Sequence, residues 1–150
     1  MARGDVKLMY PGLQGFYTAA GPFAYTACRV VVGIIMIMHV WGKFKVGAPA
    51  VAANVMAKNG LEPSLGFAYA AMFLESVGGV CLVIGLFTRF FAAALAIEMG
   101  IAFLFVHFSK GFAAGAGGYE YVLLIGVVLL AVAIRGGGPL SVDAKIGKEL

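Results

Sequence analysis

The sequence predicts an all-α integral membrane protein built as a bundle of four helices. Hydrophobic residues make up 62% of the 150-residue chain and charged residues only 12%, whereas soluble globular domains carry roughly 45–50% and about 25%. The mean hydropathy is +0.98. The apolar residues gather in four long runs, and lysines and arginines lie mostly outside or at the ends of these runs. This composition excludes a soluble enzyme, a disordered chain, a disulfide scaffold and a nucleic-acid-binding protein.

Each of the four runs is treated as one membrane span, because about 20 mostly apolar residues cross the hydrocarbon core as a helix. The spans cover about residues 23–41, 67–87, 90–108 and 119–135, and a short turn containing Arg89 joins the second to the third. Apolarity is continuous along the runs, as expected where lipid surrounds the helices. Membrane β-strands would be shorter and would alternate.

The polar connections predict the topology of this single membrane domain. The loop of residues 42–66 is the longest, and its AVAANVMAKNG stretch predicts a short amphipathic helix. Four spans place both termini on one side of the membrane. That side holds six positive residues and the other side four, a bias that predicts cytoplasmic termini. The six are Arg3, Lys7, Arg89, Arg135, Lys145 and Lys148, and the four are Lys43, Lys45, Lys58 and Lys110.

Three ionisable residues lie within the spans, namely Arg29, Glu75 and Glu98. Such residues cost about 2.5–3.5 kcal/mol on insertion scales and usually face the interior of the bundle. Counting along each span places both glutamates near mid-depth and Arg29 a few residues away. We therefore expect one buried polar layer in which Arg29 pairs with one or both carboxylates and which serves as a candidate ligand site. The alternative is a purely structural ion pair that fixes how the helices pack.

Small residues recur at a spacing of four around these charges. Gly33 follows Arg29, Gly79 follows Glu75, and Ala94 and Ala102 flank Glu98. This spacing predicts helix faces that approach one another closely.

A second tier of polar residues lies near the ends of the spans. His39 and Lys43 are one turn apart and share a face. His107 is nine residues beyond Glu98, so it reaches the same side only if the helix ends or bends there. Glu120 begins the fourth span, where the helix dipole favours an anion. These residues predict a polar pocket with aromatic walls, for which the candidates are Trp41, Tyr119 and Tyr121.

Motifs for a resident cofactor are absent from the sequence. The two histidines lack the spacing of a metal site, so no metal is predicted. Cys28 and Cys81 lie in apolar runs without a CxxC pair, which favours hydrophobic filling over redox chemistry. There is also no nucleophile–base pair, phosphate loop or dinucleotide fingerprint. We expect no intrinsic cofactor and no catalysis by the chain alone.

The sequence resembles the DoxX family of small four-helix bacterial membrane proteins over about residues 24–143. The resemblance is carried by short motifs in a fixed order rather than by one strong signature. These are Arg29 with Gly33, HVWGKF at the end of the first span, Glu75 before Gly78 and Gly79, GLFTR from Gly85 to Arg89, GGYEY from Gly117 to Tyr121, and a Gly-rich exit leading to Ser141 and Asp143.

The resemblance implies a helical bundle in the bacterial cytoplasmic membrane that is associated with respiratory or redox systems. It adds Arg89 and Tyr119 to the second tier of His39, Lys43, His107 and Glu120. The family name derives from the small subunit of a thiosulfate:quinone oxidoreductase, and some relatives are linked to thiol redox. A disulfide-carrier role is not expected here, because this chain has no cysteine pair on the outer side.

Three functions remain open from the sequence. The first is an accessory subunit of a quinone- or thiol-linked membrane oxidoreductase, with a quinone head group bound near Arg29, Glu75 or Glu98 and electrons supplied by a partner. The second is a purely structural subunit of a larger membrane complex. The third is a small proton-linked carrier, although no inverted repeat is visible. Membrane lipids and a larger complex or a homo-oligomer are the expected partners, and nucleic acid is not.

Overall fold

The computed structural model describes residues 7–150, and within this range every regular element is helical. The all-α class is therefore confirmed. Residues 1–6, which include Arg3 of the charge count, lie outside the described residues. The elements in chain order are η1 (Pro11–Leu13), α1 (Gln14–Val46), α2 (Ala48–Val51), η2 (Ala52–Met56), η3 (Ala57–Asn59), α3 (Ser64–Phe73), η4 (Leu74–Gly78), α4 (Gly79–Ile84), α5 (Thr88–Ile101), η5 (Ala102–His107), η6 (Phe108–Lys110), η7 (Ala114–Ala116), α6 (Glu120–Arg135) and α7 (Val142–Ile146).

Three stretches of the described chain are long and apolar enough to cross a membrane. They are Pro11–Val46 with 36 residues, Ser64–Ile84 with 21 and Thr88–Lys110 with 23. The fourth predicted span corresponds to α6, which has 16 residues. At 1.5 Å per residue this helix is about 24 Å long, shorter than the roughly 30 Å hydrocarbon core.

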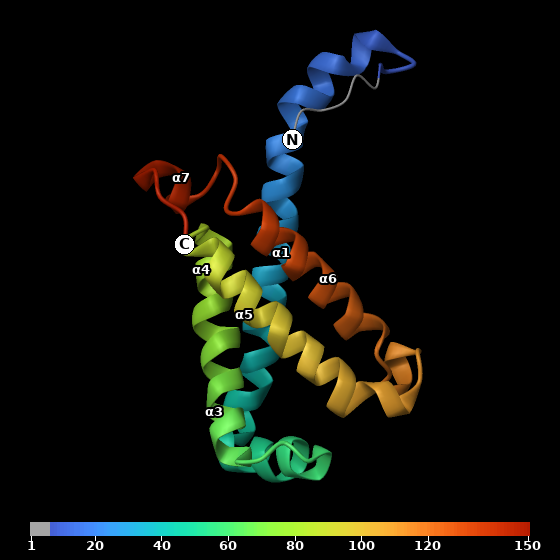
Figure 1. Cartoon of the computed structure of the whole chain (residues 1–150), viewed down its shortest axis with the longest axis vertical. Coiled ribbons are helices and arrows are strands. Elements are labelled where there is room, and N and C mark those ends of the chain that lie inside the picture. Colours follow the sequence, from blue (N-terminus) through green and yellow to red (C-terminus); the bar gives the residue numbers. More distant parts are fainter. Residues whose placement is uncertain (1–6) are drawn as a thin grey trace.

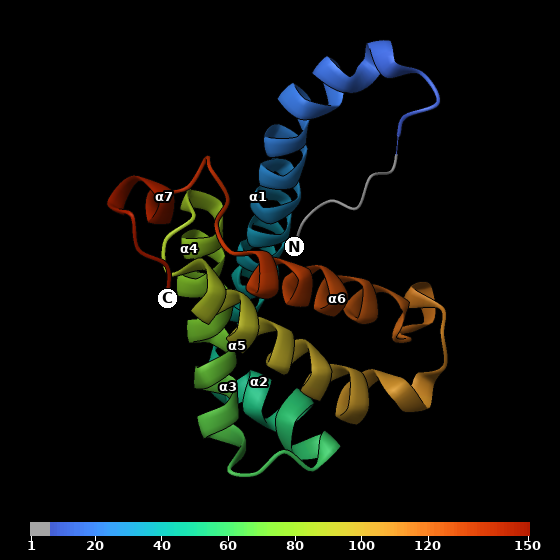
Figure 2. The same ribbon diagram turned by 45° about the horizontal axis from the view of Figure 1, so that its top comes forward.

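The helices form two packed pairs. The α3–α4 stretch runs beside α1 in the opposite direction, and α5 and α6 form an antiparallel pair that crosses them obliquely (Figures 1 and 2). The most extensive contacts join α5 with α6 and α1 with α4. The first turns of α1 project beyond the rest of the molecule. The long loop contains the helical turns α2, η2 and η3 at the position where the sequence predicts a short amphipathic helix.

The α1–α4 contact depends on two glycines. A Cβ atom on Gly33 would lie 2.8 Å from the carbonyl oxygen of Gly79, and one on Gly79 would lie 2.8 Å from Ile37 Cγ1. Both distances are shorter than real Cβ contacts, so a larger residue would force the helices apart. Gly33 and Gly79 thus lie on a close-packed face, as the spacing of small residues predicts.

The turn between α4 and α5 has a tightly constrained backbone. Gly85 has φ 74° and Phe87 has φ 48°, values that are uncommon for a bulky side chain. A Cβ atom on Gly85 would lie 2.5 Å from Ser141 Cβ. The C-terminal segment therefore packs directly on this turn.

Candidate functional site

A cavity of about 530 Å³ lies between α1, α3, α5, α6 and the η2 turn of the long loop. This volume is within the range of about 300–1,000 Å³ typical of small-molecule sites. Most of its wall is apolar, with side chains such as Phe67, Leu74 and Ile97. The titratable side chains that line it are His39, Lys43, Glu75, Glu98, His107 and Tyr121.

Lys43 and Glu75 form an ion pair across the cavity. Lys43 Nζ donates a hydrogen bond to Glu75 Oε1 at 2.7 Å. The Glu75 side chain is 2% exposed and that of Lys43 27% exposed. A buried carboxylate is costly without a partner, so Lys43 supplies the countercharge that keeps Glu75 inside the bundle.

Two residues that line the cavity each have a carboxyl oxygen without a hydrogen-bond partner among the described residues. These oxygens are Glu75 Oε2 and Glu98 Oε2, and both are buried. Glu98, on α5, lies close enough to Glu75 and Lys43 for direct Coulomb interaction with both. Because buried polar atoms in proteins are nearly always hydrogen-bonded, these two oxygens need a partner, which a proton shared between the neighbouring carboxyls, a water or a ligand can supply.

Wide π-helical turns bring these side chains to the cavity. Glu75 lies within η4, and His107 closes η5, which begins four residues after Glu98. A π turn bonds residue i to i+5 and changes the angular offset along a helix. His107 therefore lines the same cavity as Glu98, because the helix departs from regular α geometry there. Such turns occur frequently at functional sites.

The two histidines differ in how they are held. His107 Nδ1 lies 2.7 Å from the carbonyl oxygen of Gly117. Since a carbonyl only accepts, Nδ1 carries the proton in this contact, and in the neutral ring Nε2 is left as an acceptor. The ring of His39 stacks on that of Tyr121, with centroids 5.8 Å apart and an interplanar angle of 25°.

Three second-tier residues, namely Arg89, Tyr119 and Glu120, lie outside the cavity lining. Glu120 is exposed, and its Oε2 accepts a hydrogen bond of 3.1 Å from the Ala114 amide, so it orders the preceding loop. Tyr119 packs in an aromatic cluster with Phe103, Phe108 and Phe112. Glu120 and Tyr119 thus both have structural contacts that account for their positions.

Arg29 is buried but does not pair with a glutamate. Its side chain is 1% exposed, and its guanidinium donates to the carbonyl oxygens of Leu82, Val83 at 3.2 Å and Leu140 at 2.7 Å. The predicted pairing of Arg29 with a carboxylate is therefore wrong. The reason is that carbonyl groups at the end of α4 lack helical partners and lie at the depth of Arg29, whereas Lys43 already pairs with Glu75.

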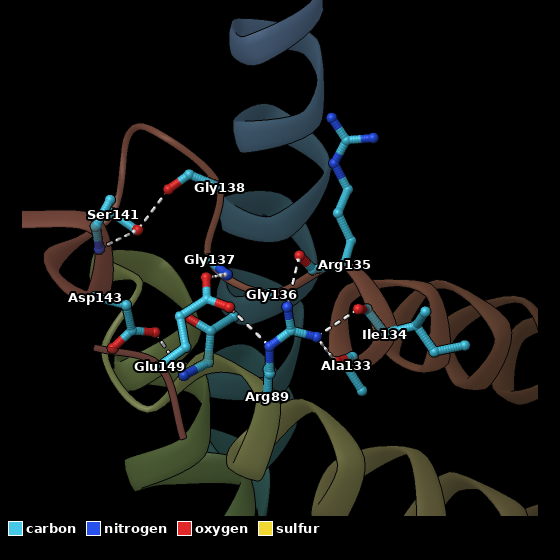
Figure 3. A network of polar contacts seen from close by, with 12 residues as sticks. Arg89, Ala133, Ile134, Arg135, Gly136, Gly137, Gly138, Ser141, Asp143 and Glu149 are labelled. Carbon is cyan, nitrogen blue, oxygen red and sulfur yellow. Dashed lines mark hydrogen bonds and ion pairs between the residues drawn. The ribbon is translucent and has the colours of Figure 1, made fainter. Parts of the chain in front are cut away.

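Arg89 performs a similar task at the end of α6 (Figure 3). Its guanidinium donates to the carbonyl oxygens of Ala133, Ile134 and Arg135. Its Nε lies 2.7 Å from Glu149 Oε2. Arg89 thus joins α5 to the end of α6 and to the C-terminal segment, and it lies outside the cavity lining.

Asp143 is a buried residue that the sequence analysis notes only through the family resemblance. Its two carboxylate oxygens accept hydrogen bonds from the amides of Phe87 and Thr88 at 2.8 and 2.9 Å. These amides begin α5, where helix N–H groups lack partners. Asp143 therefore caps α5 from α7, a contact 55 residues away along the chain that no local pattern reveals.

Comparison with known proteins now identifies the family. The model of the DoxX family matches residues 24–108, more than half of the chain. The chain belongs to the DoxX family. The matched region contains His39, Lys43, Glu75, Glu98 and His107. These are all the titratable residues of the cavity lining except Tyr121, which lies on α6.

The relatives of this DoxX protein are bacterial. One uncharacterised protein of Haemophilus influenzae is 32% identical over 133 residues, which cover 85% of this chain and 94% of the relative. A second uncharacterised protein of the same organism is 34% identical over 80 residues, 53% of each chain. No solved structure matches the chain significantly.

Proposed function

We propose that this DoxX protein is a small subunit of a membrane redox system in the bacterial cytoplasmic membrane and that its cavity binds a quinone-type ligand. The observation that carries the proposal is the pair of glutamates, Glu75 and Glu98, that line the 530 Å³ cavity and each keep a buried carboxyl oxygen without a partner among the described residues. An apolar pocket with a few convergent polar groups is the usual form of a small-molecule site.

The chemistry of the cavity suits a ring with oxygen atoms at its edge. The apolar walls accept the ring, and the Lys43 ammonium offers donors to a carbonyl oxygen. A carboxyl group donates when protonated and accepts when ionised, so Glu98 can contact either a carbonyl or a hydroxyl. When Lys43 is positive and both glutamates are ionised, these three side chains together carry a charge of −1. One carboxylate therefore has no countercharge and can exchange a proton with the ligand.

Electrons are assigned to a partner. Reducing a quinone to a quinol consumes two electrons and two protons. In this proposal the partner oxidoreductase supplies the electrons. Glu98 and His107 hold the protons and pass them to the ligand oxygens. His107 is suited to this because Gly117 fixes its Nδ1 proton, leaving Nε2 free to accept another.

Ligand binding by purified protein in lipid nanodiscs tests the proposal. We expect a benzoquinone with a decyl tail to bind saturably, and Glu98→Leu to weaken binding by up to about tenfold, because the protonated carboxyl of Glu98 donates to a quinone carbonyl and a neutral hydrogen bond contributes roughly 0.5–1.5 kcal/mol. Glu120→Leu is the matched control, since Glu120 is exposed and lies outside the cavity lining. Partition into empty nanodiscs equal to that with protein would overturn the proposal.

Copurification separates this function from a purely structural one. After gentle solubilisation of the native membrane, mass spectrometry should find an oxidoreductase and quinone together with the protein. In a structural subunit, Glu98→Gln would alter assembly of the complex but leave the turnover of the assembled complex unchanged. We expect the reverse, with normal assembly and reduced turnover.

A further inference from the structure

A second cavity lies between α1 and α6. Its volume is about 360 Å³. Apart from the Tyr121 hydroxyl and the thiol of Cys28, its lining is entirely hydrocarbon. It has the composition of a site for an alkyl or isoprenoid chain rather than for a polar group.

The two cavities lie side by side. Tyr121 and Ile125 line both of them. The helices that form the second cavity are antiparallel, because Tyr25 on α1 bonds to Gly136 after α6 while His39 stacks on Tyr121. The second cavity therefore runs along the helices from the end near Tyr121 towards Cys28.

The length of the second cavity follows from its lining on α1. It extends from Ile35 back to Ala27, a rise of eight residues that spans about 12 Å at 1.5 Å per residue. The α1–α6 groove, as we name this cavity, is thus long enough for the first part of a lipid-like tail. The rest of such a tail would continue into the bilayer.

We propose that the α1–α6 groove holds the apolar tail of the ligand whose head group lies in the main cavity. This inference rests on the proposed function and narrows the ligand to an amphiphile with a long hydrocarbon tail. The shared lining at Tyr121 and Ile125 favours this occupant over a separate lipid acyl chain, because one end of the groove lies directly beside the cavity that Lys43 and Glu98 line. In this arrangement the ligand passes beside the Tyr121 ring, which stacks on His39, and its head group and tail are joined at that point.

Two neighbouring leucines of α6 provide a matched test. Leu124 lines the groove and Leu123 does not, and both are exposed to the surroundings. We expect Leu124→Trp to weaken binding of a decyl-tailed benzoquinone about tenfold, the loss for roughly two methylene groups that are no longer buried. Binding of the same benzoquinone without its tail should be unchanged in Leu124→Trp, and Leu123→Trp should match the wild type with both probes.

Photo-crosslinking gives a readout that does not depend on a variant. A benzoquinone with a diazirine on the first carbons of its tail should label residues 27–35 of α1 and 124–128 of α6. Two results would overturn the inference while leaving head-group binding intact. One is labelling confined to η2 of the long loop, and the other is equal affinity of the tailed and tail-less probes for the wild type. If neither probe binds, the proposed function itself fails.

Discussion

At the scale of single residues, the two arginines near the helix ends have a common physical role. The last carbonyl groups of a helix have no partner within it, and water can take that place only where the helix end is exposed to it. Arg29 satisfies such groups at the end of α4 and Arg89 at the end of α6. They differ in burial, since Arg29 is 1% exposed and the Arg89 side chain 42% exposed.

This difference predicts the effect of removing each guanidinium. Arg29→Met should lower the free energy of unfolding by about 2 kcal/mol or more, because buried carbonyl groups are left without partners. Arg89→Met should cost less, because water can replace its contacts. Thermal unfolding of the purified variants in detergent measures both. Equal losses, or a greater loss for Arg89→Met, would contradict the role of burial.

The same residues show how far sequence reasoning reaches. Because charges in apolar runs are costly, the burial of Arg29 and Glu75 could be predicted from their positions within such runs. The partners could not, because counting along a span estimates depth and leaves the rotation of each helix undefined. Lys43 lies two residues beyond the predicted span at 41, yet α1 continues to Val46 and brings Lys43 to Glu75.

At the scale of elements, the contact of α1 with α4 is set by backbone approach. A Cβ atom on Gly33 would lie 2.8 Å from Gly79 O, whereas one on Gly42, further along the same helix, would meet nothing within 4 Å. Gly33→Ala should therefore destabilise the protein by about 1–3 kcal/mol, as overpacking does. Gly42→Ala should be neutral or stabilising, by up to about 1 kcal/mol, because alanine favours the helix.

Thermal unfolding of the two glycine variants, measured side by side, tests this prediction. The pair controls for helix propensity, since both changes are the same and lie in α1. A loss for Gly42→Ala as large as that for Gly33→Ala would show that close approach is not the cause.

The elements also divide into those that the sequence reveals and those that it does not. Continuous apolar runs identify the long helices, because lipid requires apolar side chains on every outward face. The π turns at η4 and η5 leave no such pattern, although they bring Glu75 and His107 to the cavity. The fold of the C-terminal segment is also hidden, because Asp143 and Glu149 act through contacts distant along the chain.

At the scale of the whole molecule, the charge bias depends on the number of crossings. With α6 as a fourth crossing, the described residues Lys7, Arg89, Arg135, Lys145 and Lys148 fall on one side of the membrane, and Lys43, Lys45, Lys58 and Lys110 on the other. The bias is small, so orientation depends on whether α6 crosses the membrane. With 16 residues, α6 can do so where the bilayer thins or where flanking residues extend the span.

Reporter insertions test crossing and orientation together. If α6 crosses and the termini are cytoplasmic, a fluorescent protein fused after Leu150 should fluoresce, and alkaline phosphatase inserted at Gly115 should be active. The reason is that Gly115 and Leu150 lie on either side of α6, and the positive-inside bias assigns the tail to the cytoplasm. Phosphatase inserted at Asn59 should also be active and serves as the control for the long loop. If the reporters at Gly115 and Leu150 lie on the same side, α6 does not cross; if they lie on opposite sides with the tail outside, the charge bias does not set the orientation.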